Sequence, residues 1–306
     1  MHGTTISAIG YECGDLRPVS DLAGTTTADI SPLVTEIVHF RESRREIWDL
    51  AAAAAERTLA TAARPDLVLY VSENDPDSTG SLARILDRLG LNDVEHLALS
   101  GQDCGNLVPA VRVASDALAA GRCERVLLLL ADRAEGRDRI MASGLSVFSD
   151  GAAACLLSGG PEPAGPRLRV EATGGRTAVR LADPEADPAE QGLLSTVRLA
   201  SETVTALLGT LGRTRADFRY AILPNYRPAA QKFLLAAMRM PPDKLLLGPV
   251  TELGHCFSAD LLITLHRLAA EGALDPGDRL LLATGGPYSW SALAVEYTHD
   301  GPAPRR

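Results

Sequence analysis

Cysteine and histidine are the residue types in this sequence that could together form a nucleophilic site. The five cysteines, Cys13, Cys104, Cys123, Cys155 and Cys256, are odd in number, widely spaced and contain no CxxC pair. Such a set argues against a disulfide scaffold and against a zinc site. An isolated cysteine is most often a small buried apolar side chain, so a catalytic thiol needs a separate argument.

An internal duplication provides that argument for Cys104. In each half of the chain, an apolar strand leads through a helix, a second strand and a second helix to a glycine and another apolar strand. The two glycines, Gly121 and Gly272, are 151 residues apart, and the same shift carries Cys104 onto His255. Because repeats of this type pack about a pseudo-two-fold axis, equivalent strand-to-helix junctions face each other. We therefore expect Cys104 and His255 to lie close together.

The expected surroundings of Cys104 favour a nucleophile. Each of the two junctions presents the N-terminus of a helix, which carries partial positive charge and free N–H donors. A thiol in that position and beside an imidazole has a lowered pKa, and it is activated for attack. The sequence therefore predicts Cys104 as the nucleophile, with His255 beside it.

Short apolar strands that alternate with helices would position these residues. Buried strands are predicted at 67–71, 126–131, 152–157, 220–223 and 279–285, and helices at 46–63 and 106–121. This alternation predicts an α/β fold with a parallel or mixed sheet covered on both faces. Residues 159–192 are rich in Pro, Gly, Arg and Asp and predict an irregular crossing. We place the boundary there, between a half at 1–165 with the nucleophile and a half at 166–306.

Composition limits the classes of function. The formal net charge of −9 argues against non-specific binding of nucleic acid. No run of about 18 apolar residues occurs, so no membrane span is expected. The first residues lack a charged segment followed by a long apolar one, so we expect no secretory signal and a cytoplasmic protein.

Several segments, in the same order along the chain, resemble the ketosynthase III branch of the thiolase superfamily. Residues 148–157 (FSDGAAACLL) are similar to that family's FGDGAGAAVL, and residues 284–297 (TGGPYSWSALAVEY) are similar to its FGGGFTWGSALVRF. The resemblance covers nearly the whole chain. It implies the thiolase fold, with duplicated βαβαβαββ halves in five layers α-β-α-β-α. It also implies a homodimer and a role in bacterial secondary metabolism of the polyketide type.

In this chain, the histidine and the asparagine of that family's catalytic Cys-His-Asn set are exchanged. The DCGN segment places Cys104 at the cysteine position. The family's PHQAN meets 224–228 (PNYRP), which puts Asn225 at the histidine position, and its GNTSAAS meets 254–260 (GHCFSAD), which puts His255 at the asparagine position. The resemblance further implies an oxyanion hole made by the backbone N–H groups of Cys104 and Gly286.

The resemblance implies an acyltransferase of the EC 2.3.1 type, in which an acyl thioester loads Cys104. Transfer to a heteroatom nucleophile needs a base, and His255 is placed to be one. Decarboxylative Claisen condensation with a malonyl thioester is the alternative, because an imidazole and an amide could still hold an enolate. A second alternative is a non-catalytic partner subunit. The persistence of the cysteine, its helix and the glycine loop favours the enzyme.

The donor is expected to be an acyl thioester of coenzyme A or of an acyl carrier protein, and no other cofactor and no metal is expected. The family holds coenzyme A with a tryptophan and an arginine, and Leu33 and Ile37 stand at these positions here. A carrier protein that docks through Arg41, Arg44 or Arg45 is therefore favoured, and the alternative for this group is a solvated helix start.

Overall fold

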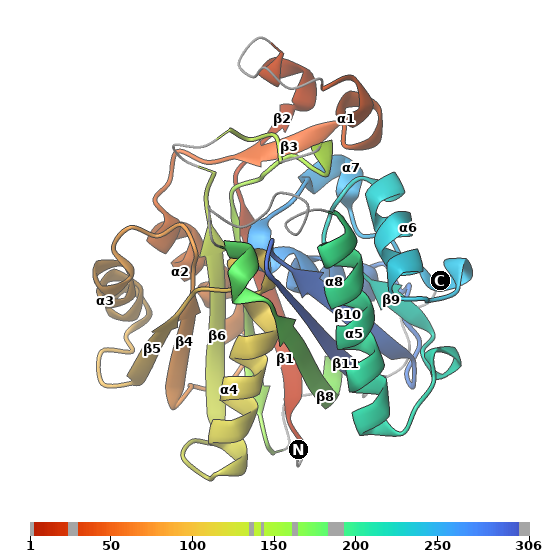
Figure 1. Cartoon of the computed structure of the whole chain (residues 1–306). Coiled ribbons are helices and arrows are strands. Elements are labelled where there is room, and N and C mark those ends of the chain that lie inside the picture. The colour runs from red at the N-terminus through yellow and green to blue at the C-terminus, as the bar shows by residue number, and fades with distance from the viewer. Residues whose placement is uncertain are drawn as a thin grey trace.

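The structure is a computed structural model, and it describes residues 3–23, 30–134, 138–141, 144–160, 165–182 and 193–299. A nine-stranded sheet forms its framework, in the strand order β5-β4-β6-β7-β1-β8-β11-β10-β9 (Figure 1). Its strands are β1 (Thr5–Cys13), β4 (Leu67–Val71), β5 (Glu95–Leu99), β6 (Arg125–Asp132), β7 (Gly151–Ser158), β8 (Pro166–Thr177), β9 (Tyr220–Ile222), β10 (Arg279–Gly285) and β11 (Ser289–His299).

The order and direction of the strands repeat in the two halves of the sheet. In the first half, β4 runs parallel to β5 and β6, and β7 runs antiparallel to β6 and β1. In the second half, β10 runs parallel to β9, and β11 runs antiparallel to β10 and β8. The halves meet where β1 and β8 pair antiparallel. The duplicated α/β arrangement predicted from the sequence is confirmed.

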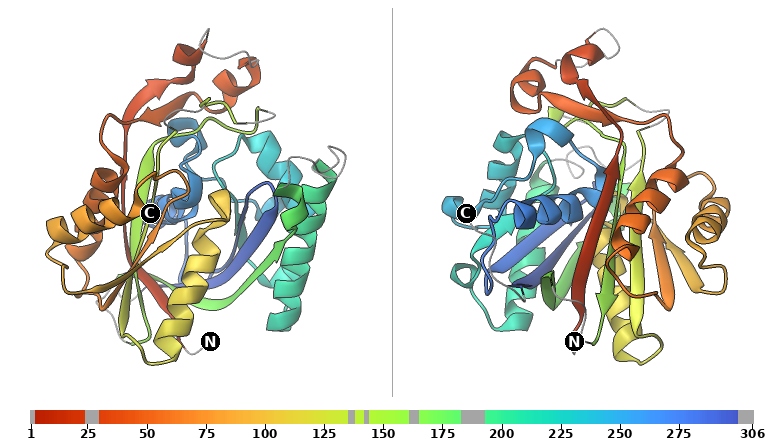
Figure 2. Two further views of the ribbon diagram at one scale, coloured as in Figure 1. Left: turned by 60° about the vertical axis from the view of Figure 1, so that its left-hand side comes forward. Right: turned by 180° about the vertical axis from the view of Figure 1, so that it is seen from behind.

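Helices lie on both faces of each half, which produces five layers (Figures 1 and 2). The outer helices are α2 (Ile47–Leu59) and α3 (Ser78–Leu89) on the first half, and α5 (Leu193–Leu211) and α6 (Pro228–Ala237) on the second. The middle layer contains α4 (Leu107–Ala119) and α8 (Asp260–Ala270), which pack against strands of both halves. Each middle helix ends before a glycine with positive φ, Gly121 and Gly272.

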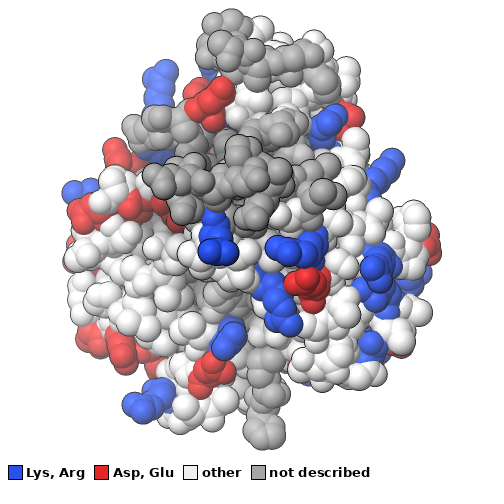
Figure 3. All heavy atoms as spheres, in the orientation of Figure 1, with Lys and Arg blue, Asp and Glu red and all other residues white. Residues whose placement is uncertain are grey.

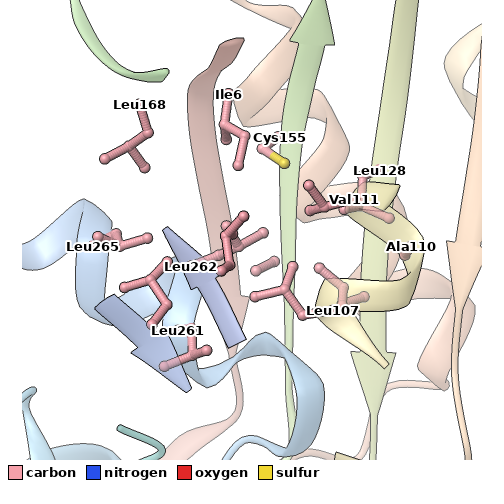
Figure 4. Packing of buried hydrophobic residues seen from close by; sticks show 14 of the residues in the cluster. Ile6, Leu107, Ala110, Val111, Leu128, Cys155, Leu168, Leu261, Leu262 and Leu265 are labelled. Atoms are coloured by element: carbon pink, nitrogen blue, oxygen red, sulfur yellow. The ribbon is translucent and has the colours of Figure 1, made fainter. Parts of the chain in front are cut away.

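The strands alternate their side chains between the middle and outer layers. In β4, Leu67, Leu69 and Val71 face the middle layer, whereas Val68 and Tyr70 face α2 and α3. Every residue of β4 and β7 is buried, as expected for strands that are covered on both faces. Figure 4 shows the middle core, where Leu107 and Val111 of α4 approach Cys155 and Leu128. This packing fixes the position of the N-terminus of α4.

The prediction of an irregular crossing at 159–192 is wrong in part. Its residues 166–177 form β8, which pairs with both β1 and β11. In this strand, buried residues alternate with partly or fully exposed ones. Leu168 and Val170 point into the middle core, and Ala172, beyond a register shift against β11, points into the core under α5. Residues 161–164 and 183–192 lie outside the described residues, and the predicted boundary at 165 falls directly before β8.

A small cap, made of residues 15–23 and 30–42, lies over one end of the sheet (Figure 1). It contains β2 (Asp15–Pro18), β3 (His39–Glu42) and α1 (Ser31–Glu36), and it packs on α7 (Val250–Leu253). Its core contains Val19, Leu33, Ile37 and Phe40, all buried. The Arg41 N–H of this cap donates to Ser149 Oγ at 2.9 Å, which ties the cap to the strand end beside the site described below.

Charged side chains of both signs lie on the surface among many uncharged ones (Figure 3). Basic and acidic side chains are interspersed on the described part of the face in Figure 3. Among the described residues, many charged side chains pair with one of opposite sign, as in Arg57–Glu12 at 2.7 Å and Arg88–Glu56 at 2.8 Å. This face is unlike the contiguous basic surface with which proteins bind nucleic acid. Among the described residues, we find no helix with the length and apolar character needed to cross a membrane.

Candidate active site

Cys104 lies at the junction that leads into helix α4. It belongs to a single turn of 3₁₀ helix (Asp103–Gly105), and its side chain is 3% exposed. Asp103 has a φ of +52°, an uncommon conformation for a residue other than glycine. Thr284 Oγ1, at the end of β10, donates to the Cys104 carbonyl at 3.0 Å. The thiol is thus held where elements of both halves meet.

His255 occupies the equivalent junction of the second half. It follows Gly254, whose φ is +56° and on which a Cβ would lie 2.6 Å from the Val147 carbonyl oxygen. The His255 N–H donates to that same carbonyl at 2.8 Å, so the backbone here needs a glycine before the histidine. The imidazole is fully buried, and its Nε2 lies 3.0 Å from Cys104 Sγ. The two residues related by the 151-residue shift are therefore in contact.

Asp260, the first residue of α8, orients the imidazole. Its Oδ2 lies 2.5 Å from His255 Nδ1, and the carboxylate is 1% exposed. Because a carboxylate accepts at Nδ1, the proton sits on that nitrogen and the lone pair of Nε2 faces the thiol. Cys104, His255 and Asp260 thus form a nucleophile–base–carboxylate line of the kind used in catalytic triads.

Sequence reasoning missed Asp260. A signal was present, because an aspartate stands five residues after His255 and directly before the apolar run of 261–265. An aspartate in that place is usually explained as a helix cap. Here the backbone N–H groups of Cys256 and Asn225 donate to its two oxygens, at 2.6 and 2.8 Å, which satisfies a buried charge from three directions.

Asn225 contacts the carboxylate of Asp260 and not the thiol. Its Nδ2 lies 3.4 Å from Asp260 Oδ1, and its Oδ1 accepts a hydrogen bond from Thr264 Oγ1 at 3.3 Å. The side chain of Cys104 makes its hydrogen bonds with His255 and Asp103. The structure thus brings Cys104 and His255 together and places Asn225 behind Asp260, because the buried carboxylate collects the surrounding N–H groups.

Aromatic rings enclose the imidazole. Tyr226 packs edge-on against His255, with ring centroids 5.0 Å apart, and Phe148 and Phe257 lie 5.6 and 5.8 Å from it. Phe148 and Phe257 stack on each other at 4.7 Å, and both belong to the apolar cluster that contains Cys104. These rings keep water from the base and strengthen the electrostatic interactions around it.

The electrostatic environment of the thiol differs from the sequence expectation. Burial raises the pKa of Cys104 well above its ordinary value, and the carboxylates of Asp103, Asp132 and Asp260 raise it further. The expectation of a lowered pKa counted the helix N-terminus and the imidazole, but not these carboxylates, which come from distant parts of the chain. The resting thiol is therefore protonated, and its proton must pass to His255 when Cys104 attacks.

Comparison with known proteins shows which proteins the chain resembles. The model of the family described as 3-oxoacyl-[acyl-carrier-protein (ACP)] synthase III C terminal matches residues 208–297. Beta-ketoacyl-[acyl-carrier-protein] synthase III 2 of Streptomyces coelicolor is 28% identical over an alignment of 270 residues, and this alignment covers 83% of this chain and 80% of that protein. The chain is thus similar to ketosynthase III enzymes along most of its length, and its C-terminal part matches their family model.

Solved structures share the fold of this chain. The 3-oxoacyl-[acyl-carrier-protein] synthase III from Aquifex aeolicus superposes with a TM-score of 0.80 at 20% identity, over 96% of this chain and 100% of that chain. ChlB3, described as an acyltransferase, gives a TM-score of 0.84 at 22% identity, over 99% and 100%. At these identities the likeness establishes the thiolase fold, and the chemistry must be argued from the site.

One of the two N–H donors of the predicted oxyanion hole already makes a hydrogen bond within the protein. The Gly286 N–H donates to the Ser289 carbonyl at 3.0 Å, and the next residue, Pro287, has no N–H. A Cβ on Gly286 would lie 2.8 Å from the Cβ of Asp103, so this turn packs directly on the Cys104 turn. An oxyanion donor role for Gly286 requires its N–H to leave Ser289, and it stays a prediction.

The three arginines predicted to receive a carrier protein differ in their surroundings. Arg45 is held by Asp49 at 2.8 Å and by Glu12 at 3.0 Å, as a residue of a structural ion-pair network. Arg41 donates its Nε–H to the Glu252 carbonyl at 3.2 Å, and Arg44 is exposed. A docking role therefore stays a prediction that suits Arg44 and Arg41 better than Arg45.

Among the described residues, no three His, Cys, Asp or Glu side chains are grouped so that they could hold a metal ion. The acidic groups nearest the thiol are instead engaged with protein donors. Asp132 Oδ1, for example, accepts hydrogen bonds from Ser72 Oγ, Glu73 N–H and Asn74 N–H.

Proposed function

We propose that this ketosynthase III-like enzyme loads an acyl group onto Cys104 and transfers it to an oxygen, nitrogen or sulfur nucleophile. The observation that carries the proposal is the line formed by Cys104, His255 and Asp260, with contacts of 3.0 and 2.5 Å. A base held by a carboxylate serves both proton transfers that acyl exchange requires.

Loading begins at the Sγ–Nε2 contact. His255 takes the proton of the Cys104 thiol, and the thiolate attacks the carbonyl carbon of the acyl thioester. The tetrahedral intermediate collapses with loss of the donor thiolate, which receives the same proton from His255. Asp260 stabilises the transient imidazolium, because it lies at hydrogen-bond distance from Nδ1. The products are acyl-Cys104 and the free donor thiol.

Transfer repeats these steps in reverse, with a new nucleophile. The acceptor occupies the position of the departed thiol, and His255 removes its proton as it attacks the acyl carbon. Cys104 leaves as the thiolate and takes the proton back from the imidazolium. Because His255 Nε2 reaches the sulfur, it also reaches a heteroatom that approaches the thioester carbon beside it. The product is an ester, an amide or a thioester.

Condensation is the alternative, and the named synthase activity of the Streptomyces coelicolor relative favours it. It needs two N–H donors on the enolate oxygen of a malonyl thioester. In this chain the amide of Asn225 is bonded to Asp260 and Thr264, and the lone pair of His255 Nε2 faces the thiol. Both features support heteroatom transfer over condensation.

A carrier protein is the donor that we propose, in bacterial secondary metabolism. Leu33 and Ile37, which stand where the family holds coenzyme A, are fully buried in the core of the cap. These side chains are thus unavailable to stack on an adenine or to hold its phosphates. Coenzyme A thioesters remain the second donor class to be tried, and a homodimer is the assembly that the family resemblance predicts.

A single-turnover experiment tests the proposal. Enzyme loaded with an acyl group on Cys104 is separated from the donor and mixed either with alcohols, amines and thiols or with a malonyl thioester. Heteroatom transfer predicts loss of the acyl mass from Cys104 in the first mixture, with formation of an ester, amide or thioester. Release of carbon dioxide and a 3-oxoacyl product in the second mixture alone would support condensation instead. A chain that accepts no acyl group from any donor would be a non-catalytic partner.

A further inference from the structure

Two further thiols meet directly behind the candidate active site. Cys13 is the last residue of β1, and Gly151 faces it across the β1–β7 ladder. Cys256 directly follows His255 in the chain. The point that a Cβ on Gly151 would occupy lies 3.2 Å from the sulfur of Cys13 and 3.2 Å from the sulfur of Cys256. The two sulfur atoms therefore share the space that this glycine leaves.

The two thiols differ in their access to solvent. Cys13 is partly exposed and lines an open cavity of about 560 Å³, whereas Cys256 is 1% exposed. Arg41, Arg57 and Arg267 line the same cavity, together with Glu12, which pairs with Arg57. A hydrogen bond with Cys13, together with burial, raises the pKa of Cys256 well above its ordinary value. A small oxidant thus meets Cys13 first and finds Cys256 as a protonated neighbour.

The backbone of Cys256 belongs to the candidate active site. Its N–H donates to Asp260 Oδ1 at 2.6 Å, and the carbonyl on the other side of that peptide belongs to His255. The same His255 carbonyl accepts the Ser149 N–H at 2.9 Å. A new covalent bond at the Cys256 sulfur would therefore act on the residue that helps to hold the base and its carboxylate.

We propose that Cys13 and Cys256 form a reversible dithiol–disulfide site, whose oxidation slows acyl transfer at Cys104. In the first step, the Cys13 sulfur attacks a hydroperoxide; an S–O bond forms, the S–H and O–O bonds break, the thiol proton passes to the departing oxygen, and a sulfenic acid and water or an alcohol result. In the second step, the sulfur of Cys256 attacks the sulfenic sulfur and releases water. Two electrons pass from the thiols to the peroxide, and a dithiol reductant returns them.

The effect on acyl transfer depends on the function proposed above, but formation of the disulfide does not. The first test therefore uses Cys104→Ala, in which the proposed nucleophile cannot react. After treatment with hydrogen peroxide, proteolysis without reductant and mass spectrometry should find one peptide pair joined through Cys13 and Cys256, with loss of two hydrogen atoms. Dithiothreitol should separate the pair. Cys123→Ser, added to this background, should leave the cross-link unchanged, and Cys13→Ser should abolish it.

The second test measures transfer in protein that contains Cys104. Peroxide should lower the rate of the wild type by up to about a hundredfold, because displacement of a catalytic group by about 1 Å costs that much. Dithiothreitol should restore the rate, and Cys13→Ser should keep its rate through the treatment. Peroxide products at Cys123 without a Cys13–Cys256 cross-link would overturn the site. If the cross-link forms and the transfer rate stays unchanged, the proposed effect of oxidation on transfer is wrong. If the untreated wild type accepts no acyl group at all, only the proposed function is refuted.

Discussion

The thiol of Cys104 is kept neutral by its surroundings, so its reactivity depends on His255. Three carboxylates and burial oppose the thiolate, and the imidazole 3.0 Å away provides the place to which its proton can move. This arrangement suits an enzyme that must not react before its substrate arrives, because the nucleophile forms only when the acyl carbon is in position. The carboxylates therefore control when the thiol reacts, and removing one should change its titration.

Asp103→Asn should lower the pKa of Cys104. The side chain of Asp103 is the largest contributor after burial, and it lies 3.4 Å from the sulfur. Without the negative charge of Asp103, the Cys104 thiolate forms at a lower free-energy cost. Alkylation of Cys104 by iodoacetamide should therefore begin at a lower pH than in the wild type. Peptide mass spectrometry measures the rate at Cys104, and Cys123 in the same sample is the internal control. Identical pH profiles for Cys104 in both proteins would contradict this assignment.

Asp260→Asn should slow loading of Cys104 by roughly a hundredfold or more, because the imidazole loses the acceptor that fixes its tautomer. Asn225→Ala should reduce the loading rate by a smaller factor, since Asn225 contacts the carboxylate of Asp260 and not the imidazole or the thiol. Quenched-flow mass spectrometry gives both rates, and the melting temperature of each variant shows whether it is folded. A larger loss for Asn225→Ala than for Asp260→Asn, in folded proteins, would support a direct role of Asn225 in the reaction.

The turn after β10 and the turn before α4 position the site through close packing. Gly286 lies against Asp103, and on Gly285 a Cβ would come within 2.5 Å of the Ser289 carbonyl oxygen. Such contacts depend on which turns meet in three dimensions. The glycines of residues 284–286 (TGG) in the sequence therefore indicated that the backbone there needs glycine, but not which neighbouring turn requires it. The strands were easier to predict, since continuous apolar runs mark β4, β6 and β10. The alternating polar residues of β8 hid a strand that pairs on both edges.

Gly286→Ala should reduce acyl loading with a modest loss of stability, because its Cβ must displace the Asp103 turn. Gly209→Ala is the matched control: Gly209 lies within α5, and a Cβ there meets nothing within 4 Å. This second variant should stabilise the protein by about 0.5–1 kcal/mol, the usual gain when alanine replaces glycine in a helix, and leave loading unchanged. Thermal unfolding and the loading rate check both. Normal loading by Gly286→Ala would argue against a tight contact between these turns.

At the scale of the whole molecule, the internal duplication is the sequence feature that predicted how the two halves pack. It predicted that two equivalent junctions would meet, and Cys104 and His255 do lie in contact at the centre of the five layers. It gave no information on which carboxylates would surround them, because Asp132 and Asp260 come from a strand end and a helix start that only the packed sheet brings near the thiol. The exchange of Asn225 and His255 relative to the family stays a prediction from motifs. The pairing of the two halves explains why their strands are buried on both faces.

Asp132 should make the stability of the protein depend on pH. Burial raises its pKa to about 7, while its backbone and Ser72 hydrogen bonds act in the opposite direction. Between about pH 4, the ordinary value, and pH 7, the folded state keeps a proton that the unfolded state has lost. The contribution of Asp132 to the free energy of unfolding therefore falls as pH rises through this range and is constant above it.

Asp132→Asn should remove this pH dependence. All three hydrogen bonds end on Oδ1, which the amide retains as an acceptor, so the replacement is close in shape and bonding. Urea unfolding at several pH values should show that the variant gains stability over the wild type as pH rises from about 4 to about 7, by a few kcal/mol. Parallel stability curves for the two proteins would contradict the raised pKa.

The acyl-enzyme tests the central claim most directly. Wild-type protein is mixed with acyl thioesters of a carrier protein or of coenzyme A, quenched in acid and weighed intact by mass spectrometry, beside Cys104→Ala and His255→Ala. The account predicts that the acyl mass appears on Cys104 of the wild type, is absent from Cys104→Ala, and appears roughly 10²–10⁴-fold more slowly on His255→Ala. A wild type that gains no acyl mass from any donor, or a His255→Ala variant that loads at the wild-type rate, would contradict it.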